Sequence, residues 1–237
     1  MGQNKKSLVS GYQAMNAKDY QDQLYALKDV LIKNPDVKII RLEKAEAVYL
    51  EKLIADIINN NEIFFKNLKT GKMTVLNTDT PIHFSLPRGE LFLSRGLISK
   101  YLKNESMLAS VLSFELVKSE RSLYPKQTII PTGYMTIERI MSLNRLGLDE
   151  KMEVHKWAHH LAMRSGFSGE YYLSWLQVQN RNTADFLFQV GDPNQLTREE
   201  SLFKGFIIKN IDDDQVISRK SSPKNFYSLI NRLRENL

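Results

Sequence analysis

Glu115 is the residue in this sequence with the clearest capacity for chemistry, because its charge interrupts an apolar helical stripe. The stretch 104–122, NESMLASVLSFELVKSERS, predicts one helix that Asn104 caps. On this helix Glu115 follows Leu108 and Leu112 at helical spacing. A carboxylate buried among core residues is costly in free energy unless a cation or hydrogen-bond donors pair with it. We therefore expect Glu115 to have a buried partner, with a half-exposed carboxylate at a helix edge as the plainer alternative.

The residues around Glu115 have the spacing of a zinc-protease motif but lack its ligands. In His-Glu-x-x-His, the histidines lie at i and i+4 of a helix so that both reach one zinc ion, and the glutamate activates the zinc-bound water. The five positions here read Phe114-Glu115-Leu116-Val117-Lys118. The glutamate is present, and both histidines are absent.

A longer stretch of sequence resembles one family of zinc metallopeptidases. HFSLPRGELFLSRGLIS (83–99) is similar to a family strand ending in Leu-Pro, a second hydrophobic strand and an Arg-Gly-Leu helix start. NESMLASVL (104–112) is similar to the family segment that leads directly into His-Glu-x-x-His. From about Ile63 to Phe206 the chain thus resembles the gluzincins that include bacterial HtpX, BepA and the CAAX prenyl endopeptidases. This resemblance implies a zincin-like fold.

The same resemblance assigns three former metal-ligand positions. Phe114 and Lys118 stand where the family has histidines, and Lys151 stands at the third ligand, a glutamate in the family; a slip of one residue would place Glu150 there instead. Phenylalanine has no lone pair for a metal, and two ammonium groups repel a dication. The resemblance therefore implies no zinc, no other cofactor and no hydrolysis, with Glu115 as a vestigial base. We expect Glu115 to form a salt bridge with Lys118, with Lys151 or with both.

The resemblance also suggests what an inactive homologue can still do. Active relatives hold an extended peptide against the strand that corresponds to residues 82–86. If the edge at His83, Phe84 and Ser85 is open, we expect the former cleft to bind a peptide or protein segment without cutting it. A closed structural scaffold is the alternative, and a covered strand edge would favour it.

Two histidines offer a different chemistry. His155 and His159 lie at i and i+4 on a predicted helix and could hold a metal ion with Glu115 as a third ligand. A divergent metal-dependent hydrolase is therefore a second interpretation, and packing histidines are the plainer one. No Gly-x-Ser-x-Gly elbow and no phosphate-binding loop occur in the sequence.

The elements that must position these residues are mostly helical. Apolar periodicity predicts helices at 19–33, 43–59, 95–101, 104–122, 134–146, 149–164, 170–179, 198–203 with Thr197 as cap, and 226–237. β-prone segments at 73–78, 82–87 and 90–94 predict a small antiparallel sheet that packs on helix 104–122, with a turn at 87–89. The fold class is α+β. We divide the chain into N-terminal helices (1–62), a peptidase-like core (63–206) and a C-terminal turn and helix (207–237), and expect one structural domain.

Composition excludes several classes of function. The chain of 237 residues is 42% hydrophobic and 25% charged, as in ordinary globular proteins, and its net charge of +6 is scattered, which argues against nucleic-acid binding. It has no cysteine and no apolar run long enough to span a membrane.

Without the apolar core of a signal peptide, the chain as written is expected in the cytoplasm. If Met1-Gly2 replaces a removed export signal, the cell envelope or periplasm is expected. The sequence assigns neither a particular partner nor an oligomeric state.

Overall fold

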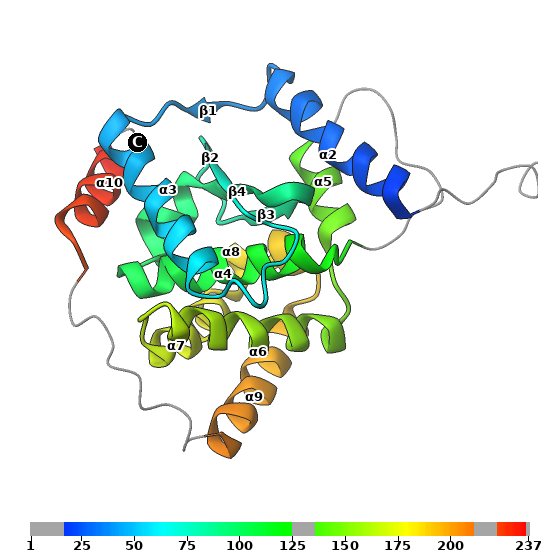
Figure 1. Cartoon of the computed structure of the whole chain (residues 1–237), viewed down its shortest axis with the longest axis vertical. Coiled ribbons are helices and arrows are strands. Elements are labelled where there is room, and N and C mark those ends of the chain that lie inside the picture. The colour runs from blue at the N-terminus through cyan, green and yellow to red at the C-terminus, as the bar shows by residue number, and fades with distance from the viewer. Residues whose placement is uncertain (1–16, 125–135, 211–221, 236–237) are drawn as a thin grey trace, which may run out of the picture.

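The computed structural model describes residues 17–124, 136–210 and 222–235, which form helices around a small sheet (Figure 1). The helices are α2 (Ala17–Lys33), α3 (Lys44–Asn59), α4 (Glu105–Arg121), α5 (Ile137–Asn144), α6 (Leu148–Arg164), α7 (Gly169–Arg181), α8 (Thr183–Val190), α9 (Pro193–Lys209) and α10 (Lys224–Glu235). Two short segments are also helical: η1 (Pro87–Gly89) is a 3-10 helix and η2 (Leu97–Tyr101) is a π-helix. The predicted α+β, mostly helical class is confirmed. No helix in these three ranges is long and apolar enough to cross a membrane.

The sheet is mixed, so the prediction of an antiparallel sheet is wrong. Its strands are β1 (Ile39–Ile40), β2 (Lys72–Leu76), β3 (His83–Leu86) and β4 (Glu90–Ser94), in the order β1-β2-β4-β3. β4 runs antiparallel to β3 but parallel to β2. The chain passes from β2 to the far edge of the sheet and then returns between β2 and β3. Local sequence shows where strands lie but not which strands become neighbours.

The turn between β3 and β4 needs its glycine for two reasons. Residues 87–89 form the predicted turn, with Arg88 at φ 66° and Gly89 at φ 73°. Positive φ values are strained for residues that carry a Cβ atom. A Cβ atom on Gly89 would also lie 2.7 Å from the carbonyl oxygen of Thr70. This turn holds β3 next to β4 and thereby sets the position of His83.

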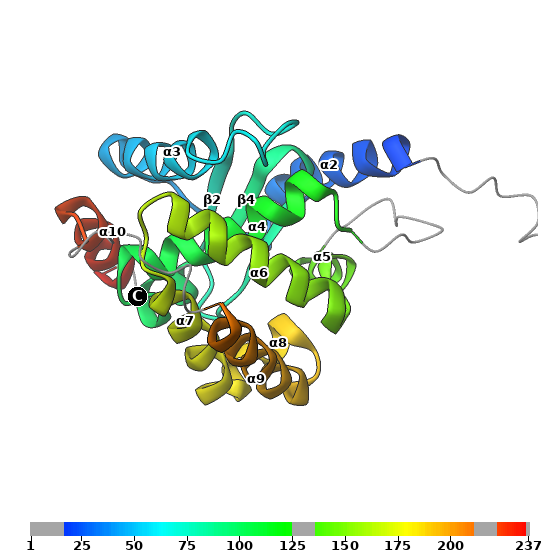
Figure 2. The ribbon, with the colours of Figure 1, turned by 60° about the horizontal axis from the view of Figure 1, so that its bottom comes forward.

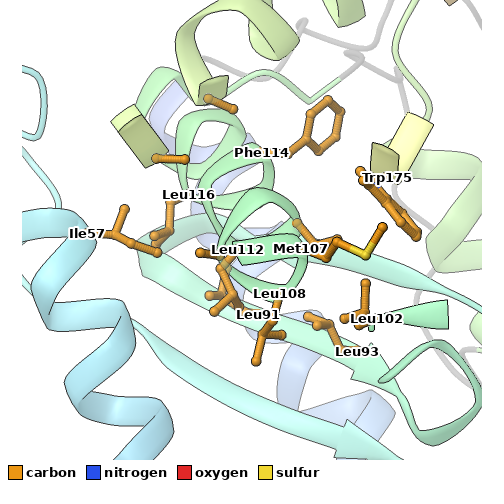
Figure 3. Packing of buried hydrophobic residues seen from close by; sticks show 14 of the residues in the cluster. Ile57, Leu91, Leu93, Leu102, Met107, Leu108, Leu112, Phe114, Leu116 and Trp175 are labelled. Carbon is orange, nitrogen blue, oxygen red and sulfur yellow. The ribbon is translucent and has the colours of Figure 1, made fainter. Parts of the chain in front are cut away.

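Helix α4 lies at the centre of the molecule and is buried on all sides. Every residue from Glu105 to Glu120 is buried, because the sheet covers one side of α4 and α6 and α7 cover the other (Figure 2). Figure 3 shows Leu108 and Leu112 beside Leu91 and Leu93 in one apolar cluster. A helix that is buried all round places its polar side chains, too, in the protein interior.

The alternation of side chains along β3 decides which residues face α4. Phe84 stacks on Phe92 with ring centroids 4.8 Å apart, within an apolar cluster that includes residues of α2 and α5. Side chains of a strand point alternately to the two faces of a sheet. His83 and Ser85 therefore lie on the opposite face of β3, where α4 packs.

Several elements differ from the sequence-based expectation. The predicted helix 198–203 is part of the longer α9, which Asp192 caps by accepting a hydrogen bond from the backbone N–H of Asn194 at 3.0 Å. Thr197 lies inside α9 and donates to the Asn180 side chain at 2.9 Å instead of capping the helix. Helix α8 was not predicted. Residues 134–135 and 236–237 of two predicted helices lie outside the described residues.

Candidate functional site

Glu115 is fully buried on α4 and has two partners. Lys118, one turn later, donates from Nζ to Glu115 Oε2 at 3.0 Å, and the Lys118 side chain is only 4% exposed. His83 on β3 places Nδ1 2.6 Å from Glu115 Oε1 and donates to it, because an ionised carboxylate can only accept. The expected pair of Glu115 with Lys118 is confirmed. The hydrogen bond from His83 to Glu115 was not predicted from the sequence. The signal for it is the alternation of side chains along β3, which places His83 on the face opposite to Phe84 and towards α4.

The surroundings of Glu115 favour its ionised form. Burial by itself raises the pKa of the Glu115 carboxyl, because a charge is poorly solvated inside a protein. The positive charge of Lys118 and the hydrogen bond from His83 outweigh burial, so the pKa falls to about 2. A carboxylate with so low a pKa, held in an ion pair and closed off from solvent, is a poor general base.

Lys151 does not pair with Glu115, so of the alternatives left open for Glu115 the structure shows the pair with Lys118. The Nζ of Lys151 donates to Glu199 Oε1 of α9 at 2.7 Å, and the Glu199 side chain is 1% exposed. Burial raises the pKa of Glu199, but the charge of Lys151 and a hydrogen bond from His155 lower it more. Sequence reasoning missed Glu199, although it shares the signal of Glu115: it interrupts a helical stripe of buried apolar residues, Leu196 and Phe203.

Phe114, Lys118 and Lys151, the three positions that the resemblance assigns to metal ligands, line one cavity of about 110 Å³. Glu150, the alternative third position, is exposed on α6 and is not part of this lining. The cavity therefore groups Lys151, and not Glu150, with the other two positions. The remaining lining residues are Met141, Asn144, Arg145, Leu146, Gln189, Val190 and Gln195.

The donor set at the cavity does not fit zinc. Phe114 offers no lone pair, and Lys118 and Lys151 each present an ammonium group that is held in place by a buried carboxylate. Hydrolytic zinc sites need three neutral or anionic protein ligands. Within the ranges that the structure describes, no group of three or more His, Asp or Glu side chains is placed to hold a metal ion.

His155 and His159 have separate surroundings. His155 Nδ1 accepts from the Tyr172 hydroxyl at 3.0 Å, and its Nε2 is 3.4 Å from Glu199 Oε2. Neither ring nitrogen of His159 has a hydrogen-bond partner among the described residues, and its ring packs against Tyr172 and Phe203. Both oxygens of Glu115 are engaged by other side chains. The structure therefore does not assemble the metal site expected from His155, His159 and Glu115.

The edge of strand β3 is covered at His83, which is one of the two cases that the sequence left undecided. The His83 N–H donates to Gln189 Oε1 at 3.0 Å, and Gln189 Nε2 donates to the His83 carbonyl oxygen at 2.8 Å. The side-chain amide of Gln189 thus takes the two backbone groups that an added peptide strand would use. His83, Phe84 and Ser85 are all buried. Because Gln189 belongs to the unpredicted α8, the sequence contained no sign of this cap.

Comparison with family models and with curated proteins assigns no relative to this chain. No family model matches it, and no curated protein matches it either. The interpretation of the site therefore depends on its own geometry: two buried lysine–glutamate pairs stand beside one cavity, and a side-chain amide closes the adjacent strand edge.

Proposed function

We propose that this protein is a catalytically inactive metallopeptidase homologue with a zincin-like fold, which binds a peptide or protein segment beside the former metal site without cleaving it. The observation that carries the proposal is the contact of Lys118 Nζ with Glu115 Oε2 at 3.0 Å. In a zinc peptidase the corresponding glutamate takes a proton from metal-bound water. Here the carboxylate of Glu115, which would take that proton, is instead paired with the ammonium group of Lys118.

The chemistry of the site supports inactivity. Peptide hydrolysis by this mechanism needs a Lewis acid that polarises the scissile carbonyl and an activated water. Phe114, Lys118 and Lys151 have the wrong donor types for such a metal, and Glu115 is committed to an ion pair. We expect no peptidase activity from these residues.

The cavity is where binding is best supported. Gln189 blocks strand addition along β3 at His83, so the arrangement expected for active relatives is not available there. The cavity lined by Phe114, Lys118 and Lys151 stands at the former catalytic position and combines apolar and polar walls. Apolar walls with a few polar groups are typical of ligand sites.

The proposal is tested by rebuilding the metal site. In the triple variant Phe114→His, Lys118→His, Lys151→Glu, the family's ligand types return to all three positions. We expect this variant to bind about one equivalent of zinc, measured by elemental mass spectrometry after dialysis against zinc, and wild type to hold less than about a tenth of an equivalent. The matched control is Phe114→His, Lys118→His, which retains Lys151 and should bind zinc far more weakly.

Two results would contradict the proposal. Equal zinc binding by the triple variant and its control would mean that the three positions do not converge as metal ligands. Stoichiometric zinc in wild type would favour a metalloenzyme, and variants of His155 and His159 would then identify the ligands.

A closed structural scaffold is the second candidate, and the Gln189 cap on β3 favours it. The two candidates differ in one measurement. A scaffold binds no peptide at the cavity, whereas the main proposal requires peptide binding that variants of the cavity walls weaken.

A further inference from the structure

The cavity beside α4 has three cations in its wall. Lys118, Arg145 and Lys151 line it, and among the residues that the structure describes no carboxylate does. The carboxylates that neutralise the two lysines, Glu115 and Glu199, are fully or almost fully buried outside the lining. A ligand in the cavity therefore meets the positive ends of both ion pairs. This arrangement attracts an anion and repels a cation.

These cations have hydrogen-bond donors to spare. An ammonium group has three N–H donors, and among the described residues Lys118 and Lys151 donate one hydrogen bond each, to Glu115 and Glu199. Arg145 donates to the Phe188 carbonyl oxygen at 3.0 Å and, among the described residues, contacts no carboxylate. An anion bound here would receive charge-assisted hydrogen bonds from groups that are already held in place.

Asn144 adds an unpartnered acceptor to the same wall. Its side chain is about nineteen-twentieths buried, since the residue is 5% exposed, and Nδ2 donates to the Ile140 carbonyl oxygen at 3.0 Å. Its Oδ1 has no hydrogen-bond partner among the described residues. A buried acceptor without a partner is costly. Because this oxygen is closed off from solvent, a ligand in the cavity could donate to it only after the Asn144 side chain shifts.

The charge and size of the site indicate which anion fits. Three cations against two carboxylates leave a single positive charge, which matches a monoanion better than a phosphate dianion. Apolar walls from Phe114, Leu146 and Val190 suit a hydrocarbon side chain. A cavity of about 110 Å³ suits the end of a chain rather than a segment that runs through it.

We infer that this cavity binds the free carboxylate at the C-terminal end of a peptide. The carboxylate lies among Lys118, Lys151 and Arg145, and an apolar terminal side chain packs on Phe114. The inference deepens the proposed function and depends on it, because it names the part of the peptide that the inactive site recognises.

The test compares two probes that differ only in the terminal group. Acetyl-Ala-Leu with a free carboxylate and acetyl-Ala-Leu-amide are titrated separately into ¹⁵N-labelled full-length protein and followed by chemical-shift changes. We expect saturable shifts with the free acid, and binding of the amide weaker by about tenfold or more, because the charge-assisted hydrogen bonds are lost.

Variants locate the binding in the cavity. Arg145 is exposed, so Arg145→Glu should fold normally and weaken binding of the free acid by about tenfold or more through charge reversal. Lys151→Gln should also weaken it. Lys156→Gln is the matched control: Lys156 lies on the same helix, pairs with Glu153 and does not line this cavity. Its affinity should equal that of wild type.

Each contrary result has its own meaning. Equal binding of acid and amide would overturn carboxylate recognition while peptide binding itself would stand. Equal affinity for sodium acetate would show that the site takes a small free carboxylate and not a peptide end, and tighter binding of inorganic phosphate would overturn the choice of anion. Unchanged binding in Arg145→Glu would place the probe elsewhere. A different result would contradict the proposed function itself, namely stoichiometric zinc in the wild-type protein.

Discussion

At the scale of single residues, two buried glutamates determine the character of this site. Glu115 and Glu199 both interrupt apolar stripes, and each pairs with a lysine that lines the cavity. A buried ion pair adds little to stability compared with an apolar pair, but removing one partner leaves a buried charge uncompensated. The pairs therefore act mainly to hold two ammonium groups at defined places.

Glu115→Gln is expected to lower the free energy of unfolding by about 3 to 5 kcal/mol, because Lys118 would be left buried without a carboxylate. Urea unfolding at pH 7 measures the loss. The far-UV circular dichroism of the variant in buffer should match that of wild type, since glutamine has nearly the same shape.

The matched control is Glu153→Gln, which breaks the exposed i, i+3 pair with Lys156. An exposed pair contributes at most about 1 kcal/mol, so this variant should unfold close to wild type. If Glu115→Gln were as stable as the control, the ion pair with Lys118 would not be a buried one.

His159 is expected to make the protein sensitive to mild acid. Burial lowers the pKa of His159, with a smaller contribution from His160, to about 4 from its usual 6.5. Below pH 6.5 the unfolded chain binds a proton that the folded chain does not, so stability falls as the pH falls towards 4. At pH 5 the loss should reach about 2 kcal/mol.

His159→Leu removes this titration. Between pH 7 and pH 5 the variant should lose about 2 kcal/mol less unfolding free energy than wild type, in urea titrations at both pH values. His160→Gln, at the half-buried neighbour, should keep most of the wild-type slope, because burial is the larger cause of the lowered pKa of His159. The same slope in His159→Leu and wild type would show that other groups cause any acid sensitivity.

At the scale of elements, the closing of β3 depends on one side chain from α8. Gln189 is separated from His83 by 106 positions in the sequence, yet it satisfies both outward-facing backbone groups of that residue. A free strand edge invites pairing with other chains. The side-chain amide of Gln189 caps the backbone groups of this edge. A hydrophobic pattern in the sequence does not predict such a polar contact.

Gln189→Ala should lower the unfolding free energy by about 3 kcal/mol, because the N–H and carbonyl of a buried residue lose their partners. Chemical denaturation measures this loss, and hydrogen exchange of the His83 amide should become faster. Gln177→Ala, at a half-buried glutamine of α7, is the control and should change stability by less than about 1 kcal/mol. Unchanged exchange at His83 would contradict the capping role.

At the scale of the whole molecule, helix α10 shares the central apolar cluster although it lies at the end of the chain. Phe226, Leu229, Ile230 and Leu233 are buried in the cluster that contains α4 residues. In Figure 1 this red helix lies beside α3, and Arg232 reaches the Arg41 carbonyl oxygen at 2.7 Å. We therefore expect α10 to unfold together with the helices and strands that form the central apolar cluster.

Leu229→Ala tests this cooperativity. Leu229 is 0% exposed, so the substitution should cost about 2 to 5 kcal/mol and should shift the far-UV circular dichroism and tryptophan fluorescence transitions together. Ser228→Ala, an exposed position on the same helix, should stay within about 0.5 kcal/mol of wild type. If only the circular dichroism transition moved, α10 would be an independent unit.

The sequence by itself determined the local elements and the chemical types at the site. Helix α4 and strand β4 follow from helical and strand periodicities that repeat within a few residues. The cap Asn104 and the turn at 87–89 follow from the residue types at those positions. The residue types at Phe114 and Lys118 already excluded zinc ligation there, because donor chemistry does not depend on the fold.

Only the tertiary structure decided which distant groups meet. In the folded chain β2 and β4 lie parallel, and Lys151 pairs with Glu199 rather than with Glu115. Gln189 lies at the edge of β3. Lys151 and Glu199 are 48 positions apart, and no local pattern records such a contact. Buried charges and backbone groups must find partners, but which partner is near depends on how whole helices pack against the sheet.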